Sequence, residues 1–421
     1  DDPLINEYIR SIGFKLVAAN QDAAGRRFDF TVLKPDVINA FALPGGYIAI
    51  YAGLMLKAEI EDEVAGVLAH EIAHVTQRHI ARRYEKAQQL QLPTLLAVIG
   101  SLIAGASNPQ AAAGGLAASL AGQQQLLLNY SRANEAEADR IGFRTLAEAG
   151  FDPRGMASFF EKLAAKYRHS PRPLEFLLTH PLPERRAADA KLRLEDIAPF
   201  RQHSQYRFWL IQERLRALVS PDGSLTDEDY RRAVKVDDKM KQRAVRHGYG
   251  VWLTRQGRAA EAMNIAKALY RTDPNVLENT VLYIDVLTEG GHLDDAITVA
   301  QKALSISPMN YPLMIAYSRA LLKAGQAKEA MKQLLALAYR QPDDVLTLEL
   351  LARAQHEAGQ EAESHETTAL YLHAIGDLKG AQLHYRKALR GRSDDPYFFT
   401  RVRGRLAALE AEMIELRAQR H

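Results

Sequence analysis

The stretch GVLAHEIAHVTQRHI, residues 66–80, decides how the first half of the chain is interpreted. It places His70 and His74 four positions apart, with Glu71 directly after the first histidine. Apolar residues recur around the histidines at three- and four-residue steps. This spacing predicts a single helix from Glu61 to about Arg83.

Residues four apart on a helix lie on the same face, so His70 and His74 can direct ring nitrogens at one metal ion about 2 Å from each. Glu71 would lie beside that ion, where it could take a proton from an attacking water molecule. The alternative is a solvated helix face that carries incidental histidines. The apolar spacing argues against this alternative, because it predicts that the helix is buried.

A third metal ligand can come from the stretch NEAEADRIG, residues 134–142. Glu135 and Asp139 are also four positions apart, so both carboxylates lie on one helix face. Glu135 could complete a set of two histidines and one glutamate, the gluzincin type, around a catalytic zinc ion. Asp139 could accept the remaining N–H of a ligating histidine and fix its tautomer. Acidic pairs at this distance are usually only solvated, so both roles depend on the histidine motif upstream.

The composition of the 421-residue chain is that of an ordinary globular protein, with 47% hydrophobic and 25% charged residues. Its 54 Lys and Arg against 51 Asp and Glu give a net charge of +3, too small a surplus to favour nucleic acid as the main partner. The absence of cysteine excludes disulfides, thiolate zinc sites and cysteine nucleophiles, and it is compatible with export. The chain starts with Asp1 rather than Met, so we expect a processed form from which a signal peptide could have been removed.

The N-terminal part mixes helix and strand. Residues 3–19 have helical apolar spacing, whereas residues 28–33 and 47–53 read as strands. An almost wholly apolar segment, residues 92–122, lies between the two predicted metal-binding helices, and Asn108-Pro109 divides it into two arms. Each arm is shorter than the ~20 residues that a membrane-spanning helix needs. A buried or lid-like helical hairpin and a hairpin that contacts a membrane both remain open.

The C-terminal half repeats with a period of 34 residues. Three residue types keep this step: glycines between two helices, alanines early in the second helix, and prolines after it. They are Gly257, Gly291, Gly325 and Gly359; Ala262, Ala296 and Ala330; and Pro274, Pro308 and Pro342. This pattern is typical of tetratricopeptide repeats, in which glycine ends the first helix in a left-handed turn and alanine lets the two helices approach. Gly376 follows Gly359 after only 17 residues, so we expect the last repeat to be irregular.

These patterns predict a mainly α protein with two domains. Residues 1–200 would form a zincin-like α+β metallopeptidase domain with a small β-sheet, and residues 201–421 an α-helical tetratricopeptide-repeat solenoid. Residues 204–246 read as helical, but they do not fit the 34-residue phase.

Five stretches together resemble a known family: INAFALPGGYIAIYAGL, LAHEIAHVTQRHIARR, NEAEADRIG, GFDPRGM and LLTHPLPERR. They are similar to the zinc metallopeptidase family that includes the heat-shock membrane protease and the CaaX prenyl-protein proteases. The similarity is greatest to its periplasmic branch, the BepA type, in which a peptidase domain precedes tetratricopeptide repeats. It extends over most of the chain.

The resemblance implies His70, His74 and Glu135 as ligands of one zinc ion per chain, with Glu71 as general base. It also implies a substrate-aligning edge strand at Asn39, Ala40 and Phe41, continuing to Leu43. The implied partners are misassembled or stalled outer-membrane proteins and the β-barrel assembly machinery, with the periplasm as the location. Peripheral membrane contact through residues 92–122 is a further expectation.

His180 lies beside two prolines in THPLPER, and such a single histidine is more often structural than a metal ligand. In the BepA type, the matching histidine can bind zinc as a fourth ligand. We therefore hypothesise a latent protease, in which His180 closes the site until substrate or a partner displaces it. The displaced His180 would then stabilise the developing oxyanion, so it has two candidate roles, one inhibitory and one catalytic. His79 and the remaining histidines are assigned no function.

Two functions follow from these expectations. The first is a zinc endopeptidase with chaperone-like activity in the assembly and quality control of outer-membrane β-barrel proteins. The alternative is a chaperone or adaptor that works through its repeats and holds a mainly structural zinc. Glu71→Gln distinguishes them, because it would abolish the first function and leave the second intact.

Overall fold

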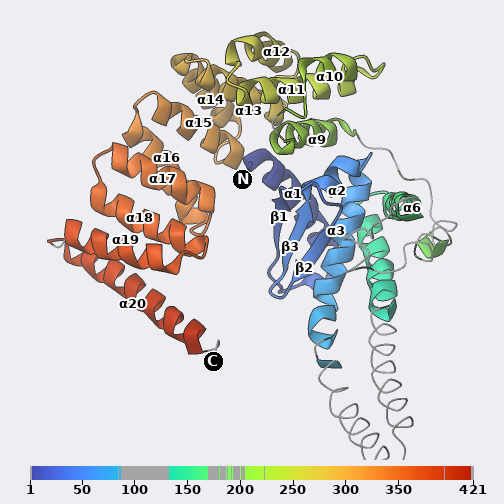
Figure 1. Ribbon diagram of the computed structural model, residues 1–421, viewed down its shortest axis with the longest axis horizontal. Helices are drawn as coiled ribbons and strands as arrows, with labels where there is room; N and C mark the ends of the chain where they lie inside the picture. The colour runs from blue at the N-terminus through green and yellow to red at the C-terminus, as the bar shows by residue number, and fades with distance from the viewer. Residues whose placement is uncertain are drawn as a thin grey trace, which may run out of the picture. The chain divides into compact units, whose positions relative to one another are not determined.

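The computed structural model describes residues 2–83, 85–86, 132–168, 180, 186, 188–190, 192, 200, 204–221, 223–392 and 394–418 (Figure 1). The apolar segment 92–122 therefore lies outside the described residues. The chain packs into two compact units. We call Ile5–Ser224 the N-terminal unit and Leu225–His421, with Asp1–Leu4, the C-terminal unit.

The N-terminal unit contains the helices and strands that carry the predicted metal-site and substrate-strand residues. They are α1 (Pro3–Ala19), η1 (Gln21–Ala23), β1 (Asp29–Leu33), β2 (Ala40–Leu43), β3 (Tyr47–Tyr51), α2 (Ala52–Lys57), α3 (Glu61–Thr76), α6 (Arg154–Arg168) and α9 (Tyr206–Val219). Residues 132–148 are also helical. Gln212 on α9 donates hydrogen bonds to the carbonyl oxygens of Met55 (2.9 Å) and Ala58 (2.7 Å), so α9 packs in this unit. The functional division after residue 200 stays a prediction, because compactness alone does not define where a function ends.

The sheet has the order β1-β3-β2 (Figure 1). β1 runs parallel to β3, and β2 runs antiparallel to it with Ala40 opposite Ile50 and Leu43 opposite Tyr47. Among the described strands, β2 therefore has a neighbour on one side only. It also packs against α3, which brings the expected substrate strand next to the histidine helix.

α3 is buried over nearly its whole length, as its apolar spacing predicts. The expectation of one continuous helix to Arg83 was wrong, because α3 ends at Thr76. Arg78 adopts a left-handed backbone conformation (φ 55°), and helical residues resume at His79. The helix is thus interrupted at Gln77 and Arg78, between His74 and His79.

α6 packs closely on α3 and fixes its position (Figure 1). Gly155, near the start of α6, is needed for this approach, because a Cβ atom there would lie 2.4 Å from the backbone carbon of Asp62. Asp62 in turn accepts a hydrogen bond from the backbone N–H of Asp152 (2.8 Å). These contacts are made by the first turn of α3, not by the later turns that carry His70 and His74.

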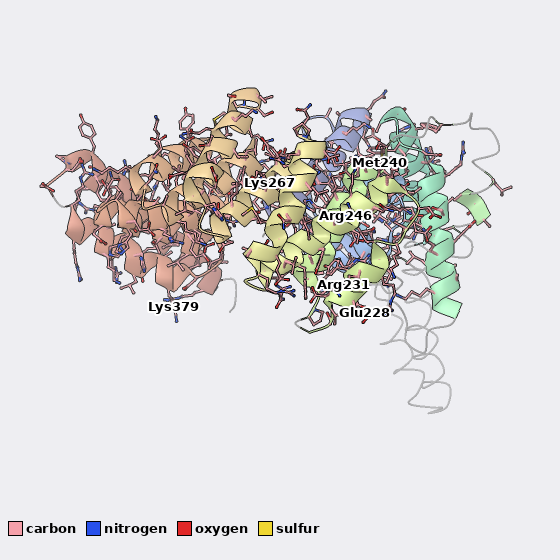
Figure 2. The ribbon with its side chains drawn as sticks, turned by 90° about the horizontal axis from the view of Figure 1, so that it is seen from above. Glu228, Arg231, Met240, Arg246, Lys267 and Lys379 are labelled. Carbon is pink, nitrogen blue, oxygen red and sulfur yellow. The ribbon has the colours of Figure 1, made fainter. Side chains whose placement is uncertain are left out.

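The described part of the C-terminal unit is helical. Its helices are α10 (Asp227–Ala233), α11 (Lys239–Arg255), α12 (Ala259–Thr272), α13 (Leu277–Glu289), α14 (Leu293–Ile306), α15 (Tyr311–Lys323), α16 (Ala327–Arg340), α17 (Val345–Glu357), α18 (Glu361–Ala374), α19 (Leu378–Gly391) and α20 (Pro396–Ala418). From α11 onward they stack one after another along a curved row (Figure 1). The surface of this unit carries exposed charged side chains, including Arg231 on α10, Arg246 on α11 and Lys267 on α12 (Figure 2).

The repeat landmarks adopt the predicted roles. Gly257, Gly291, Gly325 and Gly359 each follow the first helix of a pair with φ between 72° and 81°. The phased alanines, Ala262, Ala296 and Ala330, have no exposed surface. The expected irregularity also has a structural form: Gly376 (φ 84°) joins α18 directly to α19. α18 is the second helix of the pair that it forms with α17, and it also packs against α19. The next glycine turn therefore follows after 17 residues rather than after the 34 residues of a full repeat.

Within the described residues, no helix combines the length and hydropathy that a bilayer crossing requires. The predicted membrane contact of residues 92–122 lies outside the described residues.

Candidate metal centre

Two buried histidines on consecutive turns of α3 form the base of the site. His70 is 1% exposed and His74 is 8% exposed. Their Nε2 atoms lie 2.9 Å apart, so the two rings converge on one point as the four-residue spacing predicts.

Two further donors reach this point from other parts of the chain. Glu135, on the helical residues 132–148, places Oε2 3.3 Å from His70 Nε2 and Oε1 3.3 Å from His74 Nε2. His180 places Nδ1 3.3 Å from His70 Nε2 and 3.0 Å from Glu135 Oε2. The donor atoms of all four residues lie within 4.8 Å of one another.

These separations fit a single metal ion. Four ligands about 2 Å from a tetrahedral ion are about 3.3 Å from each other, close to the distances observed between the pairs above. Imidazole nitrogens with one carboxylate oxygen are ligands that suit zinc. The four residues could therefore hold a divalent cation with three or four protein ligands.

A buried arginine and a second carboxylate surround the ligands. Asp139 Oδ1 lies 2.9 Å from His70 Nδ1, the ring nitrogen that faces away from the other ligands. Arg186 donates to both oxygens of Asp139, through Nε at 2.8 Å and Nη2 at 2.7 Å. Its Nη1 atom lies 3.1 Å from Glu135 Oε2, and its guanidinium lies over the ring of Phe160. Arg186 thus bridges a ligand and the residue that orients another ligand.

The electrostatics of the site favour a cation at its centre. Burial by itself would raise the pKa of Asp139, but the adjacent Arg186 guanidinium lowers it to about 2. Burial likewise opposes ionisation of Glu135, yet His180 beside it holds the pKa of that carboxyl well below its usual range. Burial and Arg186 lower the pKa of His70, but hydrogen bonds to Asp139 and Glu135 outweigh them and raise it to about 9. Two ionised carboxylates therefore stabilise positive charge at the ligand cluster.

Glu71 is buried and faces a cavity next to the cluster. Its Oε1 atom lies 3.3 Å from His180 Nε2 but has no partner with hydrogen-bond geometry. The cavity has a volume of about 150 Å³, and its lining includes Glu71, His74 and His180 together with Phe41 and Ala42 of β2. It can hold several water molecules. The site thus combines a metal-ligand set, a carboxylate and a neighbouring strand.

The expected strand residues have different environments. Phe41 lines the cavity, whereas Ala40 is fully buried. Asn39 is also buried, and its side-chain oxygen accepts a hydrogen bond from the backbone N–H of Ala40 (2.9 Å). Phe41 is therefore the one of the three whose side chain lines this cavity.

Sequence reasoning gave no role to two residues of the site, Arg186 and His79. His79 is buried with its Nδ1 atom 2.8 Å from His74 Nδ1, although residues five apart on a continuous helix lie on different faces. The need for a positively charged partner could have been inferred, because the two carboxylates Glu135 and Asp139 were expected beside the histidines of a buried helix. The sequence pattern did not indicate which cationic residue would be that partner.

Comparisons with known proteins agree with this geometry. The pattern of peptidase family M48 matches residues 3–194, and a tetratricopeptide-repeat pattern matches residues 287–354. The chain is 34% identical over 395 residues to the putative beta-barrel assembly-enhancing protease of Vibrio cholerae, covering 93% of this chain and 79% of the relative. This chain belongs to peptidase family M48.

Two further relatives show how far the similarity extends. The beta-barrel assembly-enhancing protease of Yersinia pestis is 34% identical over 90% of this chain and 79% of its own length. The mitochondrial metalloendopeptidase OMA1 of Schizosaccharomyces pombe is 30% identical over 41% of this chain and 48% of its own length. This M48 protein is therefore a metalloprotease followed by tetratricopeptide repeats, and the predicted mainly α fold with a small sheet is confirmed.

Proposed function

We propose that this M48 metalloprotease is a latent zinc endopeptidase of the periplasm, acting in the assembly and quality control of outer-membrane β-barrel proteins. Relatives named beta-barrel assembly-enhancing proteases, similar over most of the chain, support the biological setting. The convergence of His70, His74, Glu135 and His180 on one point carries the chemical part of the proposal.

The ligands of one zinc ion would be His70, His74 and Glu135. The bound ion supplies Lewis acidity that polarises the scissile carbonyl and makes water a better nucleophile at neutral pH. Glu71 is the general base: its Oε1 atom takes the proton from the attacking water and later transfers it to the leaving amine. The unsatisfied Oε1 atom at the cavity wall supports this role, since it has an acceptor position available for that water.

His180 is the proposed gate. Its Nδ1 atom lies among the donor atoms of the other ligands, and its Nε2 atom lies 3.3 Å from Glu71. A fourth protein ligand closes a zinc site in the manner of structural zinc, so water cannot reach the position that Glu71 needs. Displacement of His180 by substrate or a partner would open that position, and the free imidazole could then donate to the oxyanion.

β2 is the proposed substrate guide. An extended substrate segment would add to its free side near Asn39, Ala40 and Phe41 through main-chain hydrogen bonds, which gives broad sequence tolerance. The repeats would present partners, namely stalled outer-membrane proteins and the β-barrel assembly machinery, because stacked helix pairs suit extended protein segments.

The test is the cleavage of a denatured model protein such as casein by three forms of the zinc-loaded enzyme. Glu71→Gln should retain zinc but lose about 10²–10⁴-fold in rate, because the general base is gone. His180→Ala should cleave faster than the wild type if His180 is the gate. Cleavage by Glu71→Gln at the wild-type rate would exclude Glu71 as base, and a His180→Ala variant with no gain would exclude the gate.

A chaperone or adaptor with a structural zinc remains the second candidate, and the four-donor cluster also fits it. Complementation separates the two. If Glu71→Gln fully restores outer-membrane assembly in cells that lack the protein, while substitutions on the repeat surface do not, the adaptor function is favoured.

A further inference from the structure

We propose that His79 is a positioning residue, which holds His74 in the tautomer and orientation that binding through Nε2 requires, a role that rests on the proposed zinc site. His79 lies outside the ligand cluster and has no part in the proposed chemistry. It is nonetheless 3% exposed and in direct contact with a ligand.

The two ring nitrogens of His74 face different partners. Its Nε2 atom lies 2.9 Å from His70 Nε2 and 3.3 Å from Glu135 Oε1, within the ligand cluster. Its Nδ1 atom lies 2.8 Å from His79 Nδ1, and the two rings are nearly perpendicular at 76°. A contact this short between two ring nitrogens requires one of them to carry the proton and the other to accept it.

The direction of that hydrogen bond follows from metal binding. A ligating Nε2 atom must be free of a proton, so a neutral His74 carries its proton on Nδ1 and donates it to His79. His79 then carries its own proton on Nε2, which lies 3.1 Å from Glu137 Oε2. Glu137 in turn accepts a hydrogen bond from Arg82 (2.8 Å). The hydrogen bonds thus run from His74 through His79 to Glu137, and Arg82 donates to Glu137 from its other side.

The break in α3 makes this chain of contacts possible. In a continuous helix, residues five apart point about 140° away from each other, so His79 could not meet His74. The left-handed Arg78 (φ 55°) turns the backbone and returns His79 to the ligand. A non-glycine residue rarely adopts this conformation, because its Cβ atom crowds the neighbouring carbonyl oxygen.

The two α3 ligands therefore have different support. Asp139 contacts His70 directly, whereas the carboxylate behind His74, Glu137, acts through the imidazole of His79. An intervening imidazole fixes geometry and tautomer but brings less negative charge to the metal. His79 should thus affect metal affinity and coordination geometry more than the acid–base chemistry of Glu71.

Two near-isosteric substitutions separate positioning from packing. The amide of Asn occupies the place of His Nδ1, so His79→Asn keeps an acceptor for His74. The amide of Gln occupies the place of Nε2, so His79→Gln keeps only the contact to Glu137. His79→Leu fills the space without either polar contact.

The measurements are zinc affinity, by competition with a chelator, and the visible spectrum of the cobalt-substituted protein. We expect His79→Leu and His79→Gln to lower zinc affinity about 10–100-fold and to alter the cobalt bands. His79→Asn should stay within roughly threefold of the wild type, because the bond to His74 is preserved. Glu137→Gln should cause a smaller loss, and adding it to His79→Leu should cause no further loss.

A matched control is His373→Leu, because His373 forms a similar histidine–glutamate pair with Glu412 (2.8 Å) in the C-terminal unit. It should leave zinc affinity and the cobalt spectrum unchanged. Thermal unfolding of the zinc-free variants identifies any that fail to fold, and Glu137→Gln, at a half-exposed position, keeps the test available in that case.

Equal zinc affinity in the wild type and in His79→Leu would overturn the proposal. So would equal losses in the Asn and Gln variants, which would indicate packing alone. A failure of the zinc site itself looks different: the wild type would bind no stoichiometric zinc, or His74→Ala would bind it as tightly as the wild type.

Discussion

The two units differ in how the buried residues that define them are arranged. In the N-terminal unit, a cluster of buried charged side chains forms the metal centre, where Arg186 contacts both Glu135 and Asp139. In the C-terminal unit, each helix pair buries a small residue at the same position, as Ala296 and Ala330 do. The charged cluster at the metal centre is stable only when all of its groups are present. The repeats depend instead on contacts between neighbouring helices. Substitutions should therefore have larger and less local effects at the metal centre than in the repeats.

The largest effect should come from Arg186→Leu in the zinc-free protein. Removing the guanidinium leaves the buried carboxylates of Glu135 and Asp139 without a full counter-charge, so the free energy of unfolding should fall by about 3–5 kcal/mol. Urea unfolding measures this change. Added zinc should recover part of the loss, because the bound cation offsets the same charges.

The control for this prediction is Arg10→Leu. Its ion pair with Asp29 is partly exposed on both sides (39% and 48%), so the loss should be below about 1 kcal/mol. Similar losses in both variants would contradict the view that Arg186 neutralises a buried charge cluster.

Next in size is Ala330→Leu, which tests the repeat packing. Ala330 is fully buried where α16 meets the preceding helix, and a larger side chain forces the helices apart. The free energy of unfolding should fall by about 1–3 kcal/mol, measured by urea unfolding, while zinc affinity stays unchanged. Lys328→Leu adds the same side chain on the exposed face of α16 and should have little effect. A loss of zinc affinity in Ala330→Leu would show that the repeats do not behave locally.

The sequence predicted those features that depend on spacing within one element. Four-residue steps placed His70 with His74, and the 34-residue period placed the repeat glycines. The roles of His79 and Arg186 did not follow from spacing. The role of His79 depends on the helix break at Arg78. The role of Arg186 depends on a contact with Asp139, which lies 47 residues earlier in the chain. Contacts made across a turn or between distant segments leave no periodic signal.

A smaller effect is expected at the repeat turns. Gly325 has φ 72° with open space around the position of a Cβ atom, so Gly325→Ala adds backbone strain without a clash. The free energy of unfolding should fall by about 1 kcal/mol, measured by thermal unfolding. Gly404 also has open space but lies inside α20 without a positive φ, so Gly404→Ala should increase stability by about 0.5–1 kcal/mol. The same sign for both variants would contradict the strain argument.

The smallest effect concerns a largely buried carboxylate away from the metal centre. Glu213 on α9 is 14% exposed, and its described ion-pair partner is Arg216 at 3.4 Å. Burial raises the pKa of Glu213, and Arg216 offsets this only in part. Glu135 has the same side chain and is also buried, yet its pKa is lowered, since His180 and other site residues favour its ionised form. Local partners, rather than burial, thus decide the direction of the shift.

Glu213→Gln tests this contrast through the pH dependence of stability. Because the folded pKa exceeds the unfolded one, the unfolded state loses its proton first as pH rises, and the ionised group lowers stability at neutral pH. The variant should therefore be more stable than the wild type at pH 7, by less than about 1 kcal/mol, with the difference disappearing below about pH 4. Thermal unfolding of both proteins across this range measures the difference, with the exposed Glu228→Gln as control. A Glu213→Gln variant that is less stable at pH 7 would mean that Arg216 dominates over burial.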